Sequence, residues 1–220
     1  MGRPKKSEQG PVSTSGRILQ KAMELFAEKG YNAVSVREIT RSLNLNEATL
    51  YIHYKNKASL FAAIFERWKN KLISPEFELP PVEVFQKQGD LNIGENLIMG
   101  AKRFFSKADR ETQLTWRILL NGQYHLKSAK QGVEDHILEA PVVFFTTLLQ
   151  RYQEVGKLPD HLDTESAGRI IAAVFFNFSF RANLNAAWHK RNTGITKKLN
   201  RDLQLLGDMI GNISDQGNEP

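Results

Sequence analysis

The stretch NEATLYIHYKNKASLF, residues 46–61, combines a helix start with an unusual outward surface. Asn46 is a favourable N-cap, and Leu50 is the residue best suited to anchor the helix inward. At 100° per residue, a helix that turns Leu50 inward turns a ridge of short or apolar residues outward, flanked by two hydroxyls. The four residues of this surface are Ala48, Ile52, Thr49 and Tyr51.

A second short helix is predicted immediately before this one. Ser35 and Glu38 are three residues apart and match a capping box, in which each residue satisfies a backbone N–H of the other. Asn44 tolerates the left-handed backbone that a tight turn requires. Two helices and their turn then fit within about 35–53, which predicts a helix-turn-helix.

The outward surface of the second helix suits the major groove of DNA. Small apolar groups can meet thymine methyl groups there, while hydroxyls and the following Lys55 and Lys57 can meet phosphates. The alternative is a helix whose aromatic residues pack on a neighbour.

The rest of the chain predicts an all-α fold, because apolar residues recur at helical spacing nearly throughout. We expect Gly30 to end the first helix, Pro141 to kink a later one and Gly156 to end that one. The other expected helices lie at about 15–29, 56–73, 95–107, 110–122, 133–155, 164–189 and 196–213.

Composition along the chain predicts two domains. Residues 1–14 are expected to form a flexible basic arm, and 15–73 a helix-turn-helix DNA-binding domain with a connecting helix. A larger helical domain for dimerisation and effector binding is expected at 75–213. A loop at 74–94 leads into its helices, and a disordered tail is expected at 214–220. The segment SAGRIIAAVFFNFSFRANLNAAW, residues 166–188, is apolar almost all round and predicts cover by a second subunit.

The charge distribution supports a polyanionic partner for the first third of the chain. Residues 1–73 hold 13 Lys and Arg against 6 Asp and Glu, whereas residues 74–220 hold 17 against 18. A solvated basic face is the alternative interpretation. The sequence has no apolar run long enough for a membrane span, no signal-like start and no Cys, so we expect a cytoplasmic protein without membrane contacts.

Two blocks of the chain resemble the TetR family of bacterial transcription regulators, namely LFAEKGYNAVSVREI and LNEATLYIHYKNKASLF. The resemblance implies a homodimer that binds palindromic double-stranded DNA as a repressor and responds to an unidentified small-molecule effector. It places Arg37 where members often reach a guanine, and His53 and Lys57 at positions that usually meet phosphate. Positions that touch bases or sugar-phosphate are taken by Glu47, Ala48, Thr49 and Tyr51.

Three residues depart from the common family pattern: Asn44 in the turn, and Asn46 and Glu47 at the start of the helix. An acid on the DNA-facing side leaves the base preference open. Glu47 can accept a hydrogen bond from cytosine N4 or stabilise the helix start. In the basic arm, Arg3 lies in a GRPKK segment that resembles the minor-groove hook of architectural proteins, and a solvated terminus is the alternative.

Aromatic residues concentrate in the second domain and suggest an apolar or amphipathic ligand. The candidate ligand-binding residues are Trp116, Tyr124, Phe145, Phe178 and Arg181. Most of these aromatics can instead belong to the core. Arg181 follows apolar residues along one stripe and needs a partner there, either an acid across the dimer or a carboxylate or phosphate of the ligand. A ligand-independent or architectural DNA-binding protein is the alternative function.

An enzyme would need a chemical motif that the sequence does not present. The five histidines have no metal-ligand spacing, and there is no glycine-rich phosphate loop or nucleophile elbow. The acids around His136 are interpreted as an exposed helix face. We therefore expect no catalytic residues, no metal and no cofactor.

Overall fold

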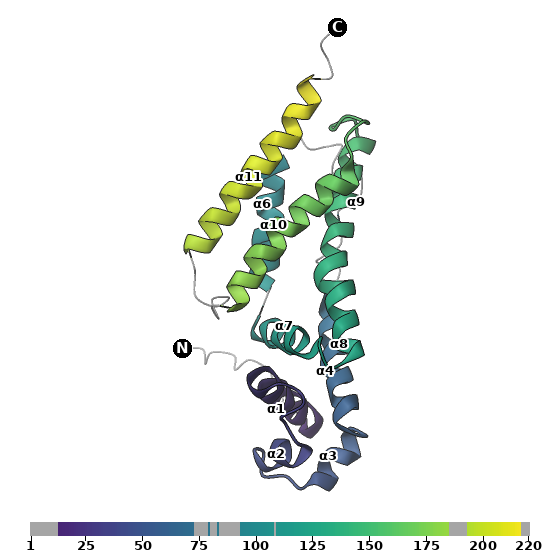
Figure 1. Ribbon diagram of the computed structural model, residues 1–220, viewed down its shortest axis with the longest axis vertical. Coiled ribbons are helices and arrows are strands. Elements are labelled where there is room, and N and C mark those ends of the chain that lie inside the picture. Colours follow the sequence, from purple (N-terminus) through teal and green to yellow (C-terminus); the bar gives the residue numbers. More distant parts are fainter. Residues whose placement is uncertain are drawn as a thin grey trace, which may run out of the picture. The chain divides into compact units, whose positions relative to one another are not determined.

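The computed structural model describes residues 13–72, 79, 83, 93–107, 109–184 and 193–216 (Figure 1). Every regular element within these residues is a helix, so the prediction of an all-α fold is confirmed. The chain divides into two compact units, Met1–Lys69 and Asn70–Pro220. The expected basic arm, including Arg3, and most of the expected loop at 74–94 lie outside the described residues.

The first unit, which we call the head, packs three helices and the beginning of a fourth around a small core. These are α1 (Thr14–Lys29), α2 (Val36–Arg41), α3 (Glu47–His53) and α4 (Lys57–Leu72). Gly30 ends α1 with a φ of 82°, a left-handed conformation that favours glycine. The core residues with the least exposure are Ile18, Ala22, Phe26, Ile39, Leu50 and Leu60.

Side-chain caps start the short helices of the head. Ser35 Oγ accepts from Glu38 N at 3.1 Å, and Asn56 Oδ1 accepts from Ser59 N at 2.8 Å. The carboxylate of Glu38 pairs with Lys29 Nζ at 2.7 Å. This partner, together with the backbone of Ser35, lowers the pKa of Glu38 below its usual range. The capping box therefore forms as predicted and also ties α2 to the end of α1.

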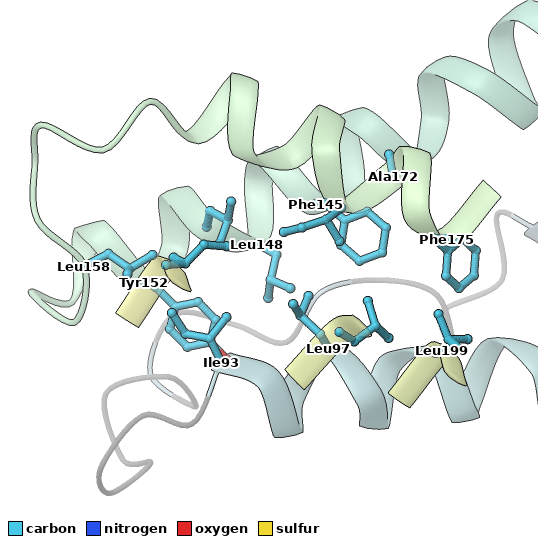
Figure 2. Packing of buried hydrophobic residues seen from close by; sticks show 14 of the residues in the cluster. Ile93, Leu97, Phe145, Leu148, Tyr152, Leu158, Ala172, Phe175 and Leu199 are labelled. Atoms are coloured by element: carbon cyan, nitrogen blue, oxygen red, sulfur yellow. The ribbon is translucent and has the colours of Figure 1, made fainter. Parts of the chain in front are cut away.

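The second unit is built from longer helices. They are α6 (Ile93–Lys107), α7 (Arg110–Gly122), α8 (Lys127–Gly132), the π-helical segment η2 (Val133–Glu139), α9 (Ala140–Glu154), α10 (Thr164–Leu184) and α11 (Thr193–Gln216). Helix α10 packs along α9, and α11 packs along α6. Figure 2 shows their apolar side chains meeting between the helices, with Phe145 and Leu148 from α9, Phe175 from α10, Leu97 from α6 and Leu199 from α11.

Small residues let two helix pairs approach closely. A Cβ atom added at Gly207 of α11 would lie 2.2 Å from the backbone nitrogen of Gly94 in α6. A Cβ atom added at Gly168 of α10 would lie 2.4 Å from Thr146 Oγ1 in α9. Neither position has space for a side chain, so these glycines are required for the helix contacts.

The helix that we expected at 133–155 differs from the prediction at its start. It continues from α8, which was not predicted, and it contains η2 directly before Pro141. We expected a kink at Pro141. The irregularity in this part of the structure is the π-helical turn of η2, in which Ala140 N–H donates to Asp135 O, five residues earlier. At the other end, Gly156 has a φ of 70° and closes the helix as predicted.

Two predicted boundaries also change. Helix α11 continues to Gln216, so the first three residues of the expected disordered tail are helical. Helix α6 begins at Ile93, inside the expected loop. The last residues of the helix predicted at 164–189 lie outside the described residues, since α10 is described to Leu184.

Candidate nucleic-acid interface

The turn between α2 and α3 is held by backbone hydrogen bonds. Asn44 has a φ of 55°, the left-handed conformation that we predicted for it. Its N–H donates to Arg41 O at 3.1 Å, and the N–H of Leu45 donates to Thr40 O at 2.9 Å. These two bonds form a Schellman-type closure of α2 and direct the chain into α3.

Helix α3 has one buried residue and an exposed opposite side. Leu50 is completely buried, whereas Tyr51 is 50% and Ile52 is 79% exposed. The predicted orientation of the helix is therefore confirmed. We call the exposed and partly exposed residues of α3 the recognition face, and they are Glu47, Ala48, Thr49, Tyr51, Ile52 and His53. Tyr51 and Ile52 thus offer apolar surface to solvent, as contact with thymine methyl groups would require.

Basic residues accompany the recognition face. Arg37 on α2 and Lys55 after α3 are both exposed, as a DNA contact requires. Arg41 is also exposed, one helical turn after Arg37, and we did not predict it as a contact residue. Their i, i+4 spacing places the two arginines on the same side of α2.

Lys57 has a structural role that we did not predict. Its Nζ donates to the backbone oxygens of Tyr31 at 2.9 Å and of Val34 at 3.0 Å, and lies 4.3 Å from the centre of the Tyr31 ring. Burial lowers the pKa of Lys57. We predicted Lys57 only as a phosphate contact, which remains a prediction, whereas these bonds mean that its removal should disturb the head.

Tyr54 forms a second long-range tether that the sequence analysis missed. Its hydroxyl donates to the backbone oxygen of Ser15 at 3.2 Å and so ties the residue after α3 to the first turn of α1. Burial raises the pKa of Tyr54 above its usual value, so the hydroxyl stays a donor at neutral pH. No local sequence pattern identifies a partner 39 residues away.

The aromatic residues expected to bind a ligand have three different environments. Phe145 and Phe178 belong to the core of the second unit. Trp116 is also buried and stacks with Phe176 at 6.3 Å between ring centres. Tyr124 is 81% exposed, so it does not share the interior of this unit with the other three.

The premise of the Arg181 prediction is wrong. Arg181 is exposed, and its Nε donates to Asn177 Oδ1 at 3.0 Å on the same helix. The buried side of α10 continues from Phe178 to Ala182, which lies 100° around the helix from Arg181. Within the single chain, a cation at this position therefore does not require an acid or a ligand to compensate for burial, and pairing with an acid across a dimer stays a prediction.

Among the helices that the structure describes, none is long and apolar enough to cross a membrane. Within the same residues, no group of three or more His, Asp or Glu side chains is arranged to hold a metal ion.

A family model described as bacterial regulatory proteins of the tetR family matches residues 18–64, which include α2, the turn and α3. Residues 18–64 therefore match the N-terminal part of the tetR family. The resemblance at LNEATLYIHYKNKASLF is thereby confirmed. The match covers the recognition face and the contacts of Lys57 with Tyr31 and Val34.

Two curated relatives of this chain are named as regulators. YerO of Bacillus subtilis (strain 168), an HTH-type transcriptional regulator, is 27% identical over 151 residues, which cover 58% of this chain and 50% of YerO. IcaR of Staphylococcus epidermidis, a negative transcriptional regulator of the biofilm operon icaADBC, is 37% identical over 57 residues, 26% of this chain and 31% of IcaR. The chain thus spans half or less of the length of these relatives.

Solved structures extend the likeness in fold to most of the chain. The transcriptional regulator FadR from Bacillus subtilis, in complex with stearoyl-CoA, matches with a TM-score of 0.60 at 20% identity. The match covers 86% of this chain and 96% of FadR. At this identity the likeness concerns the fold alone.

Proposed function

We propose that this chain is a dimeric, sequence-specific DNA-binding transcription repressor that a small apolar or amphipathic ligand releases from DNA. The observation that carries the proposal is the recognition face of α3, where Ile52 and Tyr51 are exposed opposite a completely buried Leu50. A helix placed second in a helix-turn-helix presents this side to the major groove. The negative regulation named for the relative IcaR supports repression.

The test of DNA binding is selection of bound sequences from a library of random duplexes by the full chain. Two recognition helices related by a two-fold axis read inverted half-sites, with centres about 34–36 Å or a multiple of this distance apart. We therefore expect an inverted repeat bound by two chains. No enrichment of any sequence, or tight binding of one unrepeated half-site by a monomer, would contradict the proposal.

Exposed apolar residues on the last two helices support dimerisation. Ile170 on α10 and both Leu205 and Met209 on α11 are more than half exposed in the single chain. We expect Ile170→Asp and Leu205→Asp to give monomers with poor affinity for DNA. Met99→Asp on α6 changes the charge of an equally exposed residue outside the proposed interface and should remain dimeric. If all three variants sediment as dimers, the interface lies elsewhere.

Ligand sensing is supported by the aromatic interior of the second unit and by the stearoyl-CoA bound to FadR. A ligand releases DNA only if it favours a conformation in which the two recognition helices are wrongly spaced. Fatty acids, aromatic acids and hydrophobic cations are therefore to be screened for release of the selected duplex and for changes in tryptophan fluorescence.

An acid that acts equally on wild type and Arg181→Ala would exclude Arg181 from the ligand site. If no compound changes the DNA affinity, the alternative of a ligand-independent regulator is favoured.

A further inference from the structure

The side chains of Asn46 and Thr49 share two hydrogen bonds that determine what each can offer to DNA. Asn46 Oδ1 lies 2.8 Å from Thr49 N and 2.8 Å from Thr49 Oγ1. An atom that accepts a hydrogen bond from a peptide N–H must be the carbonyl oxygen of the amide, which has no proton. The hydroxyl of Thr49 must therefore be the donor in the second bond.

This arrangement removes one hydrogen-bonding function from each residue. Thr49 has used its only proton, so its hydroxyl can offer DNA only lone pairs, beside its methyl group. Asn46 has used its oxygen and can offer only its amide N–H groups. Either residue alone would be able to donate or accept, and the pair divides these roles between them.

The major groove contains few partners for a group that only accepts. Phosphate oxygens, guanine O6 and N7, thymine O4 and adenine N7 are themselves acceptors and cannot bond to such a hydroxyl. The donors on the base edges are the amino groups at cytosine N4 and adenine N6. Thr49 is only partly buried, so its free lone pairs are accessible on the recognition face.

We propose that Thr49 is a specificity-determining residue that accepts a hydrogen bond from the amino group of a cytosine or an adenine. The inference rests on the proposed function, in which the recognition face enters the major groove. It differs from the expectation of the sequence analysis, which allowed Thr49 to contact either a base or sugar-phosphate. Asn46, in contrast, is suited to a phosphate or to an acceptor on a base edge.

The experiment removes single amino groups from the duplex that wild type selects. At each cytosine in turn, 2-pyrimidinone replaces the base and lacks the amino group at C4, while purine does the same for each adenine. Affinities of wild type, Thr49→Val and Thr49→Ser are measured by fluorescence anisotropy. Valine keeps the shape of threonine without its hydroxyl, serine keeps the hydroxyl, and thermal unfolding checks that each variant is folded.

We expect one base position at which loss of the amino group weakens wild-type binding roughly tenfold. Thr49→Ser should remain sensitive at this position. Thr49→Val should bind the unmodified duplex roughly tenfold more weakly than wild type and should not respond to the missing amino group.

Other outcomes separate this inference from the proposed function. If Thr49→Val weakens binding to all duplexes equally, Thr49 contacts the sugar-phosphate backbone and the inference is wrong. If wild type selects a sequence but no amino group is coupled to Thr49, the inference is wrong while the proposed function stands. If wild type selects no sequence, both fail.

Discussion

The head and the second unit achieve their packing by different means. In the head, polar groups join segments that are far apart in the sequence, as Lys57 does with Tyr31 and Val34 and as Tyr54 does with Ser15. In the second unit, long helices meet through apolar side chains and through close approaches at glycine. The first arrangement requires particular atoms, whereas the second requires mainly volume and shape.

The family model matches residues 18–64, which lie in the head and include Lys57 with both of its backbone partners. A tether such as Lys57 to backbone carbonyls tolerates few substitutions, because each hydrogen bond has a defined geometry. A helix core can be rebuilt from many apolar sequences of equal volume. Likeness over most of the chain therefore remains visible in the fold at 20% identity.

The largest effect is expected at the closest helix contact of the second unit. Gly207→Ala places a Cβ atom 2.2 Å from the backbone of Gly94, which cannot move without separating α6 from α11. We expect a loss of about 3 kcal/mol or more in the free energy of unfolding, measured with denaturant. Gly211→Ala is the control on the same helix, since its Cβ would meet nothing within 4 Å, and it should be neutral or stabilising by up to about 1 kcal/mol.

The next effect is a loss of stability of the second unit at alkaline pH. Burial raises the pKa of Tyr152 to about 12, whereas the unfolded phenol titrates near 10. The unfolded state loses this proton first, so stability should fall as pH rises from 10 to 12, by about 3 kcal/mol in total. Denaturant unfolding at several pH values measures the free energy of unfolding. The difference in this free energy between wild type and Tyr152→Phe isolates the contribution of the tyrosine hydroxyl. An unchanged difference from pH 9 to pH 12 would contradict the prediction.

A smaller effect is expected at the polar tether of the head. Lys57→Met removes two hydrogen bonds to backbone carbonyls and should cost about 2 kcal/mol of stability. Lys55→Met removes the same charge from an exposed neighbour and should change stability by less than about 0.5 kcal/mol. Thermal unfolding of the two variants compares them directly. Equal stability would mean that the head does not depend on this tether.

The smallest effects concern DNA contacts. Arg37→Ala should weaken binding by about 1–3 kcal/mol and relax the preference at one base pair, if it reaches a guanine. Lys55→Met, as a phosphate contact, should weaken binding to all sequences and lower the slope of log affinity against log salt by about 1. Anisotropy titrations of matched and mismatched duplexes at several salt concentrations distinguish the two. The same salt slope and the same preference in both variants would contradict this division of roles.

Local patterns allowed much of the head to be predicted. Ser35, Asn46 and Asn56 cap helices through partners three residues away, and Leu50 is buried where helical spacing places it. The role of Lys57 was not predictable, because its partners lie 23 and 26 residues away and are backbone atoms that every residue has.

The second unit was predicted less well, also for physical reasons. Helix α8 has the sequence KSAKQG, which contains no apolar spacing, and no side chain caps it at Leu126. The prediction put Arg181 on the apolar side of α10, whereas the structure exposes it. Helical spacing alone does not show which of two adjacent residues the neighbouring helices cover. The packing of the neighbouring helices decides this, and Ala182 is the residue that is buried.

The central claim is that the recognition face of the head binds DNA in a manner that no equally exposed surface of the second unit shares. Its most direct test is the affinity of Ile52→Glu and Tyr124→Glu for the duplex that wild type selects. Both residues are highly exposed, and both substitutions add the same charge, so the general repulsion of DNA is matched. We predict that Ile52→Glu binds roughly 100-fold more weakly than wild type while remaining folded, and that Tyr124→Glu changes affinity by less than about threefold. Equal affinities of the two variants would contradict the claim.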